Sequence, residues 1–185
     1  MSNAPTTFPV ALVDRLREQY GLQYLVETGS WTGQTPFYCS PMFQRVFSIE
    51  LSPHFFCRAK RRTAECSNVD IIFGNSLHVL PLIFPRIPGP TLFWLDAHWS
   101  GCDTPRLAVE CPLLGELRLL GGLRDRDVVL IDDARLFINP PGGKHRNEEW
   151  PTYRDIQAVV NEWRYPIHVT LADDTIVITR EELDW

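Results

Sequence analysis

Short apolar runs alternate with helical segments along most of this 185-residue chain. Strands are expected at 24–26, 45–49, 69–73, 91–95 and 128–131, and helices at 9–20, 33–39, 53–64, 77–84, 110–120 and 152–163. The last two apolar runs, 167–171 and 175–179, are joined by only three residues, which predicts an antiparallel hairpin. This order predicts an α/β fold with a seven-stranded, mostly parallel sheet, one antiparallel C-terminal strand and helices on both faces.

The length and charge of the chain limit the classes of protein that it can form. A chain of 185 residues is long enough for one α/β domain and too short for two of ordinary size, so 1–185 is expected to be a single domain. The 18 basic and 23 acidic side chains give a net charge of -5, which argues against a nucleic-acid partner. The local group Arg58, Lys60, Arg61 and Arg62 is interpreted as the solvated face of a helix in preference to a phosphate site.

The cysteines and the hydropathy indicate a location. The five cysteines are odd in number, widely spaced and without a C-x-x-C pair, which favours a reducing cytoplasm over a disulfide framework or a zinc site. The N-terminus has no basic segment followed by an apolar one, and no run of 18 apolar residues occurs. We therefore expect a cytoplasmic protein without a membrane span.

Two of the predicted strands end in carboxylates. Run 91–95 leads into Asp96 and His98, and run 128–131 leads into Asp132 and Asp133. Ligands of open α/β sheets bind beyond the carboxyl ends of the strands, so these side chains are expected to converge there. Crowded carboxylates repel one another unless a cation or a proton joins them, which makes the three acids a candidate ligand set for Mg²⁺ or another hard divalent cation. Capping of a helix or turn by either acid of the second pair is the structural alternative.

A turn with two glycines follows the first predicted strand. Residues 27–35 read E-T-G-S-W-T-G-Q-T, and Gly29 and Gly33 allow the backbone to approach a ligand closely. The helix that begins near Gly33 offers free N–H groups. The turn matches neither the G-x-G-x-x-G pattern of dinucleotide sites nor the G-K-[ST] of a phosphate-cradling loop.

Polar residues also follow the second and third predicted strands. Glu50 ends the second strand, where an acid commonly accepts hydrogen bonds from ribose hydroxyls; capping of the helix beside Ser52 is the alternative. Asn75 and Ser76 end the third strand and are candidates for contacting an adenine edge, although Ser76 is equally suited to cap the next helix. The turn and these residues together predict a nucleoside site.

The acid-x-Gly-x-x-x-Gly turn, the acid after the second strand and the terminal hairpin resemble the class I S-adenosylmethionine-dependent methyltransferases, which have a Rossmann-like fold. The turn is similar to the E-[IV]-G-x-[YFW]-T-G-x-[ST] of cation-dependent O-methyltransferases that act on catechols and caffeoyl esters. Those enzymes, like the macrocin-type sugar O-methyltransferases, carry an Asp after the fourth strand and an Asp-Asn or Asp-Asp pair after the fifth. The resemblance covers about 26–133.

The resemblance implies two cofactors, S-adenosylmethionine and Mg²⁺ or another divalent cation. Asp96, Asp132 and Asp133 would be the metal ligands, Glu50 would bind the ribose, and Glu27 with Gly29 would border the methionine site. The other candidates for binding the cofactor are Thr28, Ser30, Gly33, Thr35, Asn75, Ser76 and Asp96. The implied function is metal-assisted methyl transfer to a hydroxyl of a small molecule or sugar.

The proton acceptor departs from the resemblance. Catechol-type enzymes place a lysine three residues after the first metal-binding Asp, and here that position is Trp99. His98 can accept a proton near neutral pH, so His98 and Asp96 are the catalytic candidates. A histidine that only contacts the cofactor is the alternative. Segments 99–109 and 136–150 are expected to be long and irregular. The acceptor, a sugar or an aromatic hydroxyl, would be held by these segments or by a second subunit in a homodimer.

Three other functions stay open. A metal-independent N-methyltransferase would use the acids to position an amine or guanidine. A non-catalytic protein would bind S-adenosylmethionine without transferring its methyl group. A metal-dependent phosphoesterase would need phosphate-binding side chains near the acids, and Arg106 and Arg135 are candidates.

Overall fold

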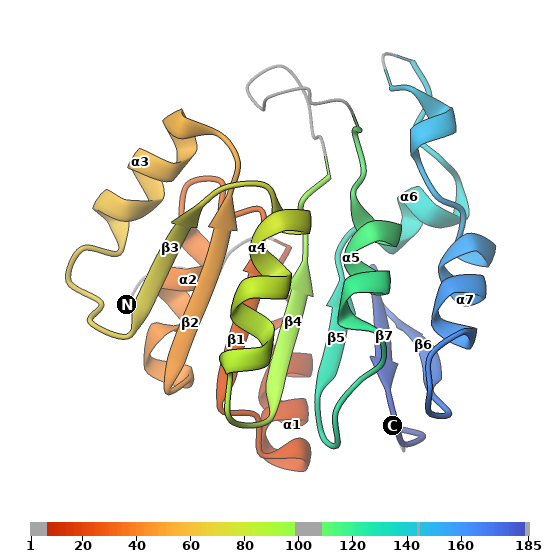
Figure 1. Ribbon diagram of the computed structural model, residues 1–185, viewed down its shortest axis with the longest axis horizontal. Helices are drawn as coiled ribbons and strands as arrows, with labels where there is room; N and C mark the ends of the chain where they lie inside the picture. Colours follow the sequence, from red (N-terminus) through yellow and green to blue (C-terminus); the bar gives the residue numbers. More distant parts are fainter. Residues whose placement is uncertain (1–6, 99–108, 144, 184–185) are drawn as a thin grey trace.

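A seven-stranded sheet organises the chain (Figure 1). The computed structural model describes residues 7–98, 109–143 and 145–183. The strands are β1 (Tyr24–Thr28), β2 (Arg45–Glu50), β3 (Val69–Phe73), β4 (Thr91–Leu95), β5 (Val128–Ile131), β6 (His168–Ala172) and β7 (Thr175–Thr179), in the order β3-β2-β1-β4-β5-β7-β6. The pairings among β1 to β5 are parallel, whereas β7 is antiparallel to both β5 and β6. The predicted sheet with one reversed strand is confirmed.

Helices cover both faces of the sheet (Figure 1). They are α1 (Val10–Tyr20), α2 (Gln34–Cys39), α3 (Pro53–Arg62), α4 (Ser76–Ile83), α5 (Leu113–Leu120), α6 (Ala134–Ile138) and α7 (Tyr153–Asn161), with short 3-10 helices η1 (Ser40–Met42), η2 (Phe84–Arg86) and η3 (Asn147–Glu149). Helices α4, α5 and α7 pack on one face, and α1 and α2 on the other. No helix in the described ranges is long and apolar enough to cross a membrane.

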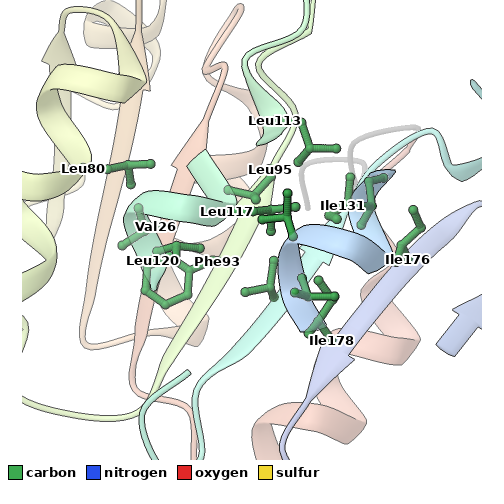
Figure 2. Packing of buried hydrophobic residues seen from close by; sticks show 14 of the residues in the cluster. Val26, Leu80, Phe93, Leu95, Leu113, Leu117, Leu120, Ile131, Ile176 and Ile178 are labelled. Atoms are coloured by element: carbon green, nitrogen blue, oxygen red, sulfur yellow. The ribbon is translucent and has the colours of Figure 1, made fainter. Parts of the chain in front are cut away.

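The central strand β4 is buried on both faces, which explains its continuous apolar sequence. Phe93 and Leu95 pack with Leu117 and Ile131 in the core under α4, α5 and α7 (Figure 2). The alternate residue Trp94 packs with Leu16 of α1 in the core on the opposite face, with no exposed surface. A strand with two covered faces ends where polar residues begin, so the carboxyl end of β4 marks the edge of the core.

Local signals define several helix ends. Helix α1 ends before Gly21, whose φ of 63° lets its N–H donate to Arg17 O. Helix α7 begins with a reciprocal capping box between Thr152 and Asp155. Helix α3 begins after Ser52, whose side chain accepts a hydrogen bond from Phe55 N–H. These helices were predicted, with ends that differ by at most two residues.

The segment after β5 differs from the prediction. Residues 136–150 were expected to be irregular, but α6 extends to Ile138 and η3 forms at Asn147–Glu149. Helix α6 has only five residues, too few to show a helical period in the sequence. Ala134 N–H, at its start, donates to Asp174 O at 2.8 Å, so a contact with the β6–β7 turn helps to form it. The predicted segment 99–109 lies almost wholly outside the described residues.

Candidate cofactor and active site

The carboxyl ends of β1, β2, β4 and β5 meet at one edge of the sheet, the upper edge in Figure 1. Backbone hydrogen bonds beyond the strands hold the following loops together: Gly29 N–H donates to Ile49 O at 2.9 Å, and Asp96 N–H donates to Thr28 O at 3.1 Å. Asp132 N–H in turn donates to Leu95 O at 3.2 Å. The predicted cofactor turn and the predicted acids therefore share one edge.

Both glycines of turn 27–35 are required by packing. Gly29 has a φ of 88°, and a Cβ there would lie 2.3 Å from the backbone oxygen of Asp96. Gly33 has a φ of 75°, and a Cβ there would lie 2.8 Å from the Cα of Ala59 in α3. The close approaches that the structure shows are to Asp96, just after β4, and to α3. The predicted close approach of these glycines to a ligand stays a prediction.

A buried polar network lies beneath the turn. The Glu27 carboxyl contacts the Ser48 hydroxyl, which also contacts the Ser30 hydroxyl, and the Thr35 hydroxyl bonds Glu27 from α2. Burial raises the pKa of Glu27 to about 7, and the hydrogen bonds from Ser48 and Thr35 oppose that rise. The structure thus brings together three predicted residues, Glu27, Ser30 and Thr35. Sequence reasoning missed Ser48, whose signal was a serine within a strand.

Glu50 fastens the turn to the end of β2. Its Oε2 accepts a hydrogen bond from Trp31 N–H and its Oε1 accepts one from Ser52 N–H, each at 2.7 Å. Burial raises the pKa of Glu50, while the backbone N–H groups of Ser52 and Trp31 oppose the rise. The backbone N–H groups of Leu51 and Ser30 act on the same carboxylate, so four N–H groups surround Glu50 at the end of β2.

The helix cap after β3 is Asn75. Its Oδ1 accepts a hydrogen bond from Leu77 N–H at 2.9 Å, so the capping role considered for Ser76 belongs to Asn75. Ser76 is the first residue of α4 and is buried. Asn75 was not expected to be the cap because Ser and Asn are about equally favoured at that position.

Glu116, which the sequence analysis did not select, lies next to Ser76. It belongs to the first turn of α5 and is 1% exposed. Burial raises the pKa of Glu116 to about 7, and the nearby hydroxyls of Ser76 and Thr28 oppose that rise. A single acid within the apolar sequence of α5 was the available signal.

His98 lies between the two acidic strand ends. Its Nε2 is 3.0 Å from Asp133 Oδ2, and its Nδ1 is 3.6 Å from Asp96 Oδ1. The imidazole is largely buried, with 7% of the side chain exposed, and its ring centroid lies 5.3 Å from that of Trp150. The structure thus brings together the two predicted catalytic residues, His98 and Asp96, and adds Asp133 and Trp150.

The three acids differ in electrostatic state. The hydrogen bond with His98 and the ion pair with Arg135 lower the pKa of Asp133 to about 2, although its partial burial acts in the opposite direction. Burial and the charge of Asp133 raise the pKa of Asp132 to about 6. Burial and the charges of Asp132 and Glu27 raise the pKa of Asp96 well above its usual range. Asp133 is therefore the acid that the site keeps ionised most firmly.

Asp133 also has an unusual backbone conformation and, besides His98, a second basic partner, Arg135. Its φ is 56°, in the left-handed region that Asp can adopt, and it immediately precedes α6. Its Oδ1 is 2.7 Å from Arg135 Nη1, and Arg135 also contacts the Asp174 carboxylate. Asp132 Oδ1 accepts the N–H of Asp133 at 2.8 Å. Asp133 is the N-cap residue of α6 but its side chain makes no capping hydrogen bond.

The acids fit a metal ion poorly in this arrangement. Both oxygens of Asp133 lie next to basic side chains, and one oxygen of Asp132 accepts a backbone hydrogen bond. Across 7–98, 109–143 and 145–183, no group of three or more His, Cys, Asp or Glu residues could hold a metal ion. The metal site at Asp96, Asp132 and Asp133 stays a prediction of the sequence.

The group of basic residues on α3 is exposed, as expected. The buried residues of the helix are Phe55 and Ala59, whereas Arg58, Arg61 and Arg62 line an open hollow of about 440 Å³. Arg62 Nε donates a hydrogen bond to the Thr32 backbone oxygen at 2.8 Å. The basic face therefore contacts the outer side of the turn while remaining in solvent.

Comparisons with known proteins show that the fold of the chain is similar to that of solved structures. No protein-family model and no curated protein matches the sequence. Among solved structures, the O-methyltransferase TomG from Streptomyces achromogenes, in complex with SAM, is 16% identical with a TM-score of 0.62, over 96% of this chain and 82% of TomG. The O-methyltransferase from Bacillus cereus in complex with SAH is 16% identical with a TM-score of 0.62, over 95% of this chain and 83% of that one.

The fold is that of the class I methyltransferases. It is not restricted to O-methyltransferases, because the N-methyltransferase NodS from Bradyrhizobium japonicum WM9 is 13% identical with a TM-score of 0.58, over 93% of this chain and 94% of NodS. Within this methyltransferase fold, the predicted residues form two neighbouring groups. The turn and Glu50 make up the first, and Asp96, His98 and Asp133 make up the second.

Proposed function

We propose that this protein binds S-adenosylmethionine and transfers its methyl group to a hydroxyl of a small molecule. The observation that carries the proposal is the meeting of the turn 27–35, Glu50 and Asp96 at one edge of a class I methyltransferase fold. TomG and the Bacillus cereus O-methyltransferase, which share this fold, hold SAM and SAH respectively. Those two O-methyltransferases also support a hydroxyl as the methyl acceptor.

Glu50 would hold the ribose of the cofactor, and turn 27–35 would hold its methionine end. Glu50 is fixed by the N–H groups of Trp31 and Ser52, and its carboxylate would accept hydrogen bonds from the two ribose hydroxyls. Asp96 and the backbone of turn 27–35 would bind the methionine end, whose ammonium group suits a carboxylate. Asn75 and Ser76 stay the candidates for the adenine edge.

His98 is positioned to accept the proton of the acceptor hydroxyl. Methyl transfer from a sulfonium is an in-line displacement: the oxygen–carbon bond forms, the carbon–sulfur bond breaks, and the sulfur leaves with the electron pair as a neutral thioether. The hydroxyl proton must go to a base. If His98 Nε2–H donates to Asp133, the lone pair of Nδ1 remains free to take that proton.

A second candidate function is methylation of an amine. The similarity to the N-methyltransferase NodS favours it, and an ionised acid such as Asp133 would attract a cationic amine. The two candidates differ in the bond that is formed. Mass spectrometry of a methylated product, with fragmentation that separates O-methyl from N-methyl groups, distinguishes them.

The cofactor assignment is tested by calorimetric titration with S-adenosylhomocysteine. Glu50→Gln should weaken binding about 10- to 100-fold, because hydrogen bonds to a charged acceptor contribute about 1.5–3 kcal/mol. Glu162→Gln, which alters an exposed acid at the end of α7, should leave the affinity unchanged. Equal affinities for the wild type and a folded Glu50→Gln variant would exclude Glu50 as the ribose ligand.

A further inference from the structure

The structure points to an acidic site that works without a bound metal: we propose that His98 and Arg135 hold Asp133 in place of a divalent cation. This inference rests on the proposed methyl-transfer site, and it departs from the metal set that the sequence resemblance implies. It assigns Arg135 a positioning role that the sequence analysis did not give it.

The first support is the pairing of both Asp133 oxygens. Oδ2 is 3.0 Å from His98 Nε2, and Oδ1 is 2.7 Å from Arg135 Nη1. Mg²⁺ needs carboxylate oxygens at roughly 2.0–2.1 Å in near-octahedral geometry. Each oxygen of Asp133 already contacts a basic group. A metal ligated by Asp133 would therefore have to displace either the His98 imidazole or the Arg135 guanidinium.

The second support is that Arg135 is anchored by more than Asp133. Its guanidinium contacts the carboxylate of Asp174, and its backbone N–H donates to Asp174 Oδ1 at 2.9 Å. The preceding residue, Ala134, donates its N–H to Asp174 O at 2.8 Å. The β6–β7 turn thus fixes the start of α6 and places the Arg135 guanidinium beside Asp133, although the side chain is 59% exposed.

The arrangement has a consequence for His98. Arg135 holds Asp133, and Asp133 Oδ2 accepts a hydrogen bond from His98 Nε2–H. This bond fixes the imidazole ring and leaves Nδ1 facing Asp96. Arg135 therefore acts on the proposed proton acceptor through Asp133. In a metal-assisted site the carboxylates would instead be directed at the ion.

Titration with Mn²⁺, followed by the loss of the free-ion signal in electron paramagnetic resonance, tests the inference. The wild type should bind no Mn²⁺ with a Kd below about 1 mM. Arg135→Gln frees Asp133 Oδ1 and should gain Mn²⁺ affinity by about tenfold or more, whereas Arg135→Lys keeps the cation and should not. Arg180→Gln, which removes an ion pair with Asp125 just after the end of β7, is the matched control and should behave as the wild type.

Two results would overturn the inference. One is micromolar Mn²⁺ binding by the wild type that Asp132→Asn abolishes, since this would establish the three acids as metal ligands. The other is equal Mn²⁺ binding by the wild type and the Arg135→Gln, Arg135→Lys and Arg180→Gln variants. Titration of the same samples with S-adenosylhomocysteine keeps the two proposals separate, because absence of that binding would count against the methyltransferase function alone.

Discussion

Replacement of Glu116 by Gln should make the stability of the protein less sensitive to pH. Glu116 is 1% exposed, and burial raises its pKa from 4.5 to about 7. That difference corresponds to about 3 kcal/mol. The pKa of Glu116 is higher in the folded than in the unfolded protein. Its contribution to the free energy of unfolding is therefore fully present below about pH 4.5 and is lost as the pH rises toward 7, where the buried carboxyl must ionise. Gln cannot ionise, so this part of the loss disappears.

The measurement is urea denaturation of the wild type and Glu116→Gln at several pH values. The free energy of unfolding of the variant, minus that of the wild type, should increase by about 2–3 kcal/mol between pH 5 and pH 8. Glu27 is also buried with a raised pKa, but it is present in both proteins and cancels in the difference. Glu162→Gln should show no pH-dependent difference. A Glu116→Gln difference that is the same at pH 5 and pH 8 would show that the pKa of Glu116 is not raised by folding.

Two further predictions concern the turn and the proton acceptor. Gly29→Ala should lower the free energy of unfolding by about 2 kcal/mol or more, because its Cβ would meet the Asp96 oxygen at a positive φ. Gly142→Ala should cost much less, since no atom of the described residues lies within 4 Å of its Cβ, and similar urea midpoints for both variants would contradict this. His98→Gln should lower turnover about 10²- to 10⁴-fold while S-adenosylhomocysteine affinity stays near that of the wild type, and normal turnover would exclude His98 as the base.

The parts of the fold that follow from buried periodic sequence were predictable. The continuous apolar runs of β4 and β5 are buried on both faces, and Gly21 and Thr152 signal helix ends through local chemistry. Helix α6 was not predictable, because its five residues are too few to show a period and its first N–H is satisfied by Asp174, about forty residues away in the sequence.

The candidate site was predictable where it follows from strand ends. Glu50 and Asp96 were selected because they follow strands whose carboxyl ends converge, and Glu27 because its turn resembles that of O-methyltransferases. Backbone hydrogen bonds link the loops at these strand ends. The partners that complete the site come from elsewhere in the chain: Glu116 enters from α5, and Arg135 is placed by the β6–β7 turn. Neither position has a local pattern, because each depends on how distant segments pack.

A crystal structure with S-adenosylhomocysteine would show where the cofactor binds. We expect the ribose hydroxyls within hydrogen-bond distance of the Glu50 carboxylate, with the homocysteine end against turn 27–35 and Asp96. Density for the ligand elsewhere on the molecule, or no binding at saturating concentration, would contradict this expectation.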